Sequence, residues 1–136
     1  MTDVLTPEQR RRCMARIRGK DTSPEIIVRT MIRALGYSFR THVPGLPGRP
    51  DIVLGRLHRA IFVHGCFWHR HSCTLGQVFP STRAAFWRAK LVGNKERDAR
   101  TIRALRRRGW KVLVVWECQT REPTRILPRL TNFLRV

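Results

Sequence analysis

Residues 46–73, LPGRPDIVLGRLHRAIFVHGCFWHRHSC, constrain the fold and the chemistry of this chain more than any other stretch. They hold one carboxylate, four of the five histidines and two of the four cysteines. Two short apolar runs, DIVLG and AIFVHG, separate these groups and have the length and composition of β-strands. So many metal-binding and acid–base groups beside two strands predict an active site next to a metal site.

The chain is strongly basic, with 28 Lys and Arg residues against 9 Asp and Glu residues and a formal charge of +19. Charge of one sign opposes compaction unless a polyanion or counterions neutralise it, so the composition favours a nucleic acid partner. A basic membrane-surface protein would need a sustained amphipathic helix, which no segment shows clearly. At 136 residues we expect a single domain over 1–136, in the cytoplasm, with no membrane partner and with reduced cysteines.

The order of the expected elements is typical of an α/β fold. Capping patterns and apolar periodicity predict helices over residues 7–19, 24–35 and 123–136, and one long helix or two joined helices over 81–109. Strands are expected over residues 37–43, 51–55 and 60–65, and a fully buried central strand over 111–118. The arginine-rich N-terminal helix, within residues 1–20, either leans on the core through Met14 and Ile17 or lies against DNA as an arm.

Asp51 follows Pro50 and stands at the first position of its predicted strand. A hairpin centred between Leu57 and His58 would pair positions that sum to 115 and would set Asp51 opposite His64. A carboxylate on rigid backbone can hold a hard cation such as Mg²⁺ against a scissile phosphate. The alternative is that Pro50-Asp51 is simple turn chemistry.

Three metal-ligand residues, Cys66, His71 and Cys73, lie within eight positions, and Cys118 ends a later predicted strand. Zn²⁺ prefers four thiolate or imidazole ligands in a tetrahedron, and two adjacent segments can supply three and one. Buried cysteines without a ligand are the alternative. Cys13 lies on the arginine-rich helix and is the least suited of the four cysteines.

The remaining histidines and aromatics suggest acid–base chemistry and DNA contact. His64 and His69 are left over from the zinc set, and a neutral histidine can take a proton from an attacking water. Phe67 and Trp68 would point to opposite sides of an extended chain, so at most one of them enters the core easily. The other is a candidate wedge between bases, and a place in the core is the alternative for either residue taken singly. Glu25 stands in the first turn of a helix, where the dipole alone can explain a carboxylate.

Four runs resemble the very short patch repair (Vsr) endonuclease family in order and spacing: LPGRPD, FVHGCFWHRHSC, FWRAKLVGNKERD and GWKVLVVWEC, within residues 8–120. The resemblance implies a restriction-endonuclease-like fold, PD-(D/E)XK-type, in which helices flank a mixed central sheet beside a structural zinc site. It also implies Mg²⁺-dependent nicking of duplex DNA 5′ of the thymine in T:G mismatches, which arise when 5-methylcytosine deaminates. The alternatives are a zinc-stabilised DNA-binding module that does not cut and a nuclease of the same fold that acts on unmismatched nucleic acid.

The resemblance also implies roles for individual residues. Mg²⁺ would be held by Asp51 and the backbone carbonyl of Val63, with His69 as the base, His64 assisting at the phosphate and Glu25 orienting these groups. The structural Zn²⁺ would be bound by Cys66, His71, Cys73 and Cys118. DNA would be contacted by the wedge residues Phe67, Trp68 and Trp87, by Lys90 and Asn94 at the mismatch, and by Met14 on the N-terminal helix.

The chain departs from related nucleases at one point and from the Vsr family pattern at another. Related nucleases carry an acidic residue and a lysine on the next strand, whereas this chain has Val63-His64-Gly65. Residues 74–82 and the tail match the family pattern loosely, which leaves the preferred flanking sequence open. A mismatch has no two-fold symmetry, so we expect a monomer acting near the bacterial nucleoid, with mismatch-repair proteins as further partners.

Overall fold

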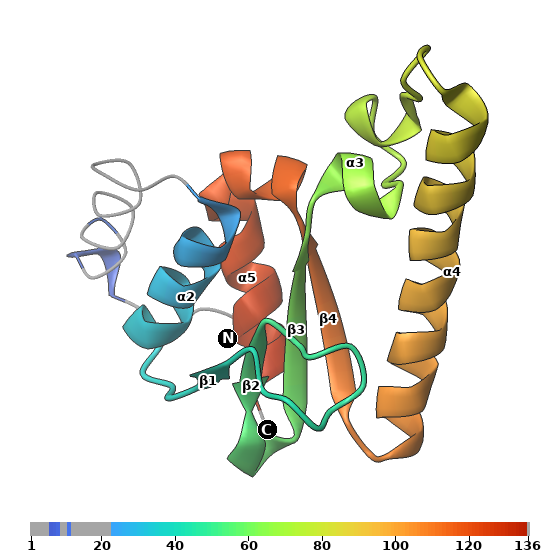
Figure 1. The fold of residues 1–136 in the computed structure, drawn as a ribbon. Coiled ribbons are helices and arrows are strands. Elements are labelled where there is room, and N and C mark those ends of the chain that lie inside the picture. Colours follow the sequence, from blue (N-terminus) through green and yellow to red (C-terminus); the bar gives the residue numbers. More distant parts are fainter. Residues whose placement is uncertain (1–5, 9–10, 12–22, 136) are drawn as a thin grey trace.

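The computed structural model describes residues 6–8, 11 and 23–135 and places a four-stranded sheet between helices (Figure 1). The strand order is β1 (Arg40–Thr41), β2 (Ile52–Leu54), β3 (Arg59–His64) and β4 (Lys111–Trp116). The first three strands pair antiparallel, and β3 pairs parallel with β4. The sheet is therefore mixed, as expected. Met14 and most of the predicted N-terminal helix lie outside the described residues.

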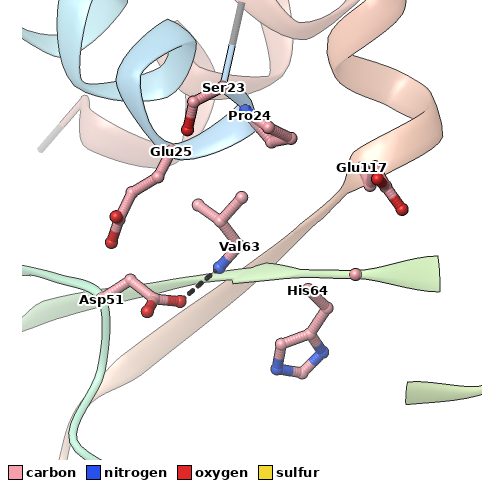
Figure 2. A pocket seen from close by; sticks show the side chains of 8 residues that line it. Ser23, Pro24, Glu25, Asp51, Val63, His64 and Glu117 are labelled. Carbon is pink, nitrogen blue, oxygen red and sulfur yellow. Dashed lines mark hydrogen bonds between the residues drawn. The ribbon is translucent and has the colours of Figure 1, made fainter. Parts of the chain in front are cut away.

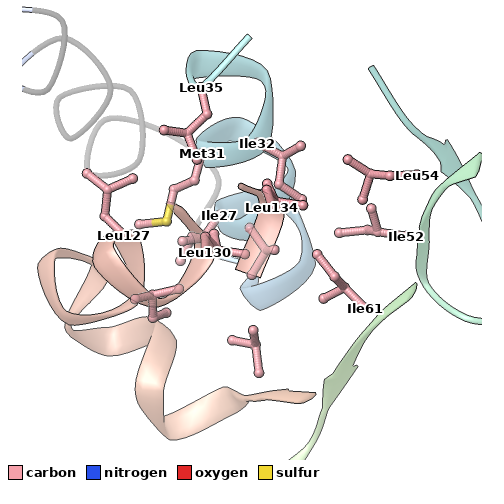
Figure 3. Close-up of a cluster of buried hydrophobic side chains, with 13 residues drawn as sticks. Ile27, Met31, Ile32, Leu35, Ile52, Leu54, Ile61, Leu127, Leu130 and Leu134 are labelled. Atoms are coloured by element: carbon pink, nitrogen blue, oxygen red, sulfur yellow. The ribbon is translucent and has the colours of Figure 1, made fainter. Parts of the chain in front are cut away.

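Helices α2 (Pro24–Ala34) and α5 (Pro123–Leu134) cover one face of the sheet (Figure 1). Proline at the start of α2 suits the first turn, and Ile27, Val28, Met31 and Ile32 then recur at helical spacing and are all buried. Figure 3 shows these side chains meeting sheet residues such as Ile61 and the buried leucines of α5. Each fully buried aliphatic side chain stabilises the fold by about 1.5–3 kcal/mol, so this cluster is the main core.

The other face of the sheet packs on α4 (Ala84–Arg107). This helix runs unbroken through Gly93, which decides for one long helix rather than two. A smaller cluster of Ala60, Phe62 and Leu105 joins it to β3, while the arginines of its other sides stay exposed. Gly48 lies against Phe62 and the side chain of α4 residue Thr101, where a Cβ would clash, so the turn before Asp51 is pressed onto this face.

Short helices complete the chain: η1 (Gly55–Leu57) in the hairpin, α3 (Cys66–His69) directly after β3, η2 (Leu75–Gln77), and η3 (Glu117–Arg121) after β4. Cys118 therefore lies in η3, one turn beyond its strand. The helix α3 carries Phe67 and Trp68, so the expectation of an extended chain there was wrong. No helix in the described part of the chain combines the length and apolar character needed to cross a bilayer.

Two expectations about the sheet are corrected. Residues of β2 and β3 pair at positions that sum to 113, as in Ile52 with Ile61, because β2 ends at Leu54 and β3 begins at Arg59, so the turn is centred one residue earlier than expected. Continuing that register sets Asp51 opposite Phe62 rather than His64. The apolar strand β4 lies at the edge of the sheet, not at its centre, and only Val115 within it is fully buried.

Candidate active site and metal-ligand cluster

Asp51 is fixed at the end of β2 by the backbone of the neighbouring strand. Its Oδ2 accepts a hydrogen bond of 2.7 Å from the backbone N–H of Val63, as Figure 2 shows. The N–H and C=O groups of one strand residue point to the same side, so the Val63 carbonyl also faces the end of β2. A side-chain oxygen and a backbone oxygen are thus held together by the sheet. The predicted pair of Asp51 and the Val63 carbonyl can therefore approach one cation.

Glu25 reaches the same place from the first turn of α2 and is joined by a residue that the sequence did not single out. His42 Nε2 lies 3.0 Å from Glu25 Oε1, and His42 Nδ1 lies 3.7 Å from Asp51 Oδ1. Arg29 pairs with the other Glu25 oxygen at 3.0 Å. Burial raises the pKa of Asp51 above its ordinary value; the hydrogen bond from Val63 opposes that rise and the charge of Glu25 adds to it. A bound cation would relieve this cost of ionisation.

A cleft of about 210 Å³ opens beside these carboxylates. Its lining comes from the start of α2, the end of β3 and the start of η3, with Ser23, Pro24, Glu25, Asp51, Val63, His64, Gly65 and Glu117. Three of the predicted site residues, Glu25, Asp51 and His64, therefore line the same cleft.

The two histidines left over by the zinc assignment lie together on the α4 side of the sheet. The rings of His64 and His69 are stacked with centroids 3.9 Å apart, and His69 Nδ1 lies 2.5 Å from Asp98 Oδ2 of α4. A histidine that donates Nδ1–H to a carboxylate keeps Nε2 as a proton acceptor. Burial, reinforced by the charge of His69, lowers the pKa of His64 to about 4, so His64 is neutral near pH 7.

The four predicted zinc ligands converge. One ligand atom from each of Cys66, His71, Cys73 and Cys118 lies within 4.8 Å of all the others. The sulfurs of Cys118 and Cys66 lie 3.4 Å and 3.8 Å from His71 Nδ1. Ligands at ordinary zinc–sulfur and zinc–nitrogen distances in a tetrahedron lie about 3.6 Å apart, so the donor set fits Zn²⁺ without rearrangement.

The cysteines of this cluster differ in acidity. Burial raises the pKa of Cys66 to about 12, whereas a backbone hydrogen bond from Gly76 lowers the pKa of Cys73 to about 7. Gly76 is held against the backbone of His71, where a Cβ would lie 1.9 Å from its carbonyl oxygen. Thiolates bind metal and thiols do not, so occupation of the cluster requires Cys66 to lose a proton that its surroundings otherwise retain.

The predicted DNA-contact residues gather where α3 meets the beginning of α4. Phe67, Trp68 and Trp87 lie with ring centroids 5.2–6.2 Å apart, and Trp68 is 45% exposed. Lys90 lies 5.9 Å from the Trp68 ring, and the Asn94 amide donates to the Trp68 carbonyl at 3.2 Å. An exposed aromatic group flanked by cations suits contact with bases and phosphates.

Three polar residues of the site escaped the sequence analysis: His42, Asp98 and Glu117. Glu117 accepts a hydrogen bond of 3.2 Å from the backbone N–H of Cys66 and so links the cleft to the cysteine cluster. Asp98 lies in a charged run, and such a run is typical of the solvent-exposed face of a helix, so the run alone did not place Asp98 in the site. Its spacing of four from Asn94, which holds α3, was the available signal that it faces the same loop.

These features define a class before any comparison is made. A mixed α/β fold with carboxylates and paired histidines at one sheet end, beside exposed aromatics on a very basic chain, is the combination expected of a nuclease.

Comparison with known proteins gives the family. The sequence model described as DNA mismatch endonuclease Vsr matches residues 2–75. The type II nicking enzyme V.XorIIP of Xanthomonas oryzae pv. oryzae is 46% identical over 134 residues, which cover 98% of both chains. DNA mismatch endonuclease Vsr of Escherichia coli is 44% identical over 121 residues, which cover 89% of this chain and 77% of that protein. The chain belongs to the Vsr family of DNA endonucleases, which confirms the resemblance.

Proposed function

We propose that this protein nicks duplex DNA on the 5′ side of the thymine in T:G mismatches and so initiates very short patch repair. The observation that carries the proposal is that Asp51 and His64 line one cleft at the end of β3, with His69 stacked on His64 and an exposed aromatic group next to it. The similarity to an enzyme named DNA mismatch endonuclease supports the choice of substrate. The mixed sheet with helices on both faces supports a restriction-endonuclease-like fold within a single domain.

Mg²⁺ and Zn²⁺ are the cofactors that the donor sets favour. Asp51 and the Val63 carbonyl offer oxygen ligands, and the raised pKa of Asp51 makes a cation there favourable. When bound, Mg²⁺ supplies charge neutralisation for the scissile phosphate and the departing 3′ oxygen. The cluster of Cys66, His71, Cys73 and Cys118 suits a structural Zn²⁺ because all four positions are protein ligands.

The chain's own residues then divide the chemistry. Asp98 holds His69 through Nδ1, which leaves Nε2 to accept the proton of an in-line water. His64, stacked on His69 and neutral, lies ready to contact the phosphate, and Glu25 orients the carboxylate side of the site. The zinc cluster includes Cys66, the first residue of α3. A bound Zn²⁺ would therefore fix α3, and with it His69 and Trp68, without itself taking part in the reaction.

The aromatic group gives the proposal its preference for mismatches. Phe67, Trp68 and Trp87 can enter a base stack as a wedge, and unstacking costs least where pairing is already imperfect. Lys90 and Asn94 stand beside this wedge to contact the exposed base edges. Met14, which lies outside the described residues, would contact the opposite groove. The enzyme would act as a monomer on nucleoid DNA in the cytoplasm, with mismatch-repair proteins as further partners.

The deciding experiment is a nicking assay with Mg²⁺ on matched duplexes and on duplexes with one T:G mismatch in varied flanking sequence. We expect one cut 5′ of the mismatched thymine and no cut in matched DNA. Equal cutting of matched duplexes would overturn the proposed specificity for T:G mismatches but would support the nuclease activity. Binding without cutting would favour the non-catalytic zinc module, a reading that gives the His69–Asp98 pair no purpose.

A further inference from the structure

His42 stands between the two carboxylates of the cleft and has no part in the function proposed above. Its two ring nitrogens face different partners: Nε2 lies 3.0 Å from Glu25 Oε1 and Nδ1 lies 3.7 Å from Asp51 Oδ1. One ligand atom from each of these three residues lies within 4.8 Å of the other two. The side chain is 48% exposed, so it is not held there as a part of the core.

The backbone brings His42 to this position. Strand β1 pairs with β2 so that Thr41 is opposite Ile52, and the next backbone N–H, that of His42, donates to the Asp51 carbonyl at 3.2 Å. His42 then adopts a left-handed conformation with φ of 49°, which few residues other than glycine favour. The local backbone is therefore tied to the residue whose carboxylate its ring approaches.

The separation of His42 Nδ1 and Asp51 Oδ1 fits two ligands of one cation better than a hydrogen-bonded pair. A separation of 3.7 Å between Nδ1 and Oδ1 is too long for a hydrogen bond. In an octahedral site with 2.0–2.1 Å bonds, adjacent ligands lie about 3 Å apart, so a cation between Nδ1 and Oδ1 would draw these two atoms somewhat closer together. Glu25 Oε1 is buried and makes no hydrogen bond of good geometry, so it too remains available.

The charges around the group allow a cation to enter. Asp51 and Glu25 repel each other, and Arg29 pairs with Glu25 Oε2 at 3.0 Å while the same guanidinium nitrogen lies 3.3 Å from His42 Nε2. His42 Nδ1, on the Asp51 side of the ring, is therefore the nitrogen open to a cation. The Asp51 oxygen that faces His42 is the one that Val63 does not bond. One oxygen of each carboxylate is thus committed to the protein, and the other is directed to the space beside the imidazole.

We propose that His42 is a nitrogen ligand of the catalytic cation, which adds affinity for a transition metal such as Mn²⁺ to a site whose oxygen donors suit Mg²⁺. The inference rests on the proposed nuclease site and extends it. Mg²⁺ favours oxygen ligands almost exclusively, whereas imidazole nitrogen is a good ligand for first-row transition metals. An imidazole beside Asp51 and the Val63 carbonyl therefore shifts the preference of the site without changing its oxygen donors.

The test is direct detection of nitrogen on bound Mn²⁺. Full-length, zinc-loaded protein is titrated with Mn²⁺, and electron spin echo modulation from ¹⁴N is recorded. We expect nitrogen modulation in the wild type and in His58→Gln, and its loss in His42→Gln. His58 is the matched control because it is also an exposed histidine with a left-handed backbone, φ of 53°, and it stacks on Trp110 away from the cleft.

Affinities give a second readout. By titration calorimetry we expect His42→Gln to weaken Mn²⁺ binding about tenfold and to change Mg²⁺ binding less than about twofold. Unchanged Mn²⁺ affinity with persistent nitrogen modulation would overturn the proposal. Tighter Mg²⁺ binding in His42→Gln would also overturn it, since His42 would then act as an internal counter-charge that competes with the cation.

Asp51→Ala separates this inference from the function on which it rests. If that variant keeps full Mn²⁺ affinity, the cation site itself is wrong and both proposals fail. If it loses Mn²⁺ while His42→Gln keeps both affinity and modulation, only the role of His42 fails. Nitrogen modulation in a protein that cuts no DNA would sustain the cation site and overturn the proposed function instead.

Discussion

The two ligand groups near the end of β3 are built in opposite ways. Asp51, Glu25 and His42 come from regular elements or their ends, and backbone hydrogen bonds from Val63 and His42 fix the carboxylate residue. The cysteine cluster instead collects its donors from α3, the following loop and η3, and its members mostly contact one another. The sheet thus fixes the carboxylate site by backbone contacts, whereas a metal bound by the cysteine cluster would be expected to hold its loop together.

The proposed Mg²⁺ and Zn²⁺ would therefore have different effects on the protein. Oxygen donors on a preformed sheet can exchange a hard cation with little change in structure. Thiol donors on irregular chain lose their protons and their freedom when they bind, so metal binding there is also folding. One cluster is therefore expected to govern the chemical step and the other the stability of α3.

The largest effect is expected from Asp51→Ala. The variant removes the oxygen donor that the sheet positions, so nicking of a T:G duplex should fall by about 10³-fold or more, while mismatch binding stays within about twofold. Single-turnover nicking and a binding titration measure the two quantities. Glu122→Ala removes an exposed carboxylate outside the cleft and is the matched control. Undiminished nicking by Asp51→Ala would refute the assignment.

Cys73→Ser tests the role of the cysteine cluster in stability. It removes one of four ligands, so zinc should be lost and the protein destabilised by on the order of 5 kcal/mol, because zinc binding there contributes to folding. Metal analysis and thermal unfolding measure both. Withholding Mg²⁺ should leave the melting temperature nearly unchanged, as expected for a preformed site. Cys13→Ser is the control cysteine, and a stable, zinc-free, active Cys73→Ser protein would contradict the structural role.

Asp98→Asn should give a smaller effect on the chemical step alone. The amide has no charge to stabilise a protonated His69, and its NH2 group can donate to Nδ1 and so place the ring proton on Nε2, so kcat should fall by about 10²-fold with KM nearly unchanged. As a positioning residue, Asp98 should also shift the pH–rate profile, and Asp98→Glu should recover part of the rate. An unchanged rate and profile in Asp98→Asn would remove the pair from the mechanism.

The ligand set and the main helices could be predicted because their signals are local. Cys66, His71 and Cys73 are close in sequence, and the apolar spacing within α2 and α5 is visible in any window of a few turns. For α4 the sequence left one long helix or two joined helices open, and the structure shows one, with helix-forming residues on both sides of Gly93. Strand β3 was found within one residue of its bounds for the same reason.

The remaining features depend on contacts between distant segments. The register of β2 with β3 was wrong by two because the turn that contains η1 is centred between Arg56 and Leu57, one residue earlier than the local sequence pattern indicated. The edge position of β4 is set by strand order, which its apolar composition does not encode. His42 and Asp98 became part of the site only when β1 and α4 were placed against the β2–β3 end, since neither residue lies in a motif.

His64 lies between the two clusters and gives the smallest predicted effect. Its ring is 6% exposed, stacked on His69 and 5.2 Å from the ring of Trp116, and its Nδ1 is buried without a hydrogen bond. Burial lowers the folded-state pKa to about 4, against 6.5 for an ordinary histidine. Above pH 6.5 the group is neutral in both states and has no effect on the pH dependence of stability.

As pH falls from 6.5 to 4, the unfolded chain takes up a proton that folded His64 does not, so this part of the stability is progressively lost. We expect the free energy of unfolding of zinc-saturated protein to fall across this window by on the order of 2 kcal/mol more than in His64→Gln. Urea unfolding at pH 7, 6 and 5 measures the difference between the two slopes. Because both proteins carry the same cysteine cluster, acid release of zinc is common to them. Parallel slopes would mean that the pKa of His64 is not lowered in the fold, so that His64 would carry a positive charge at pH 5.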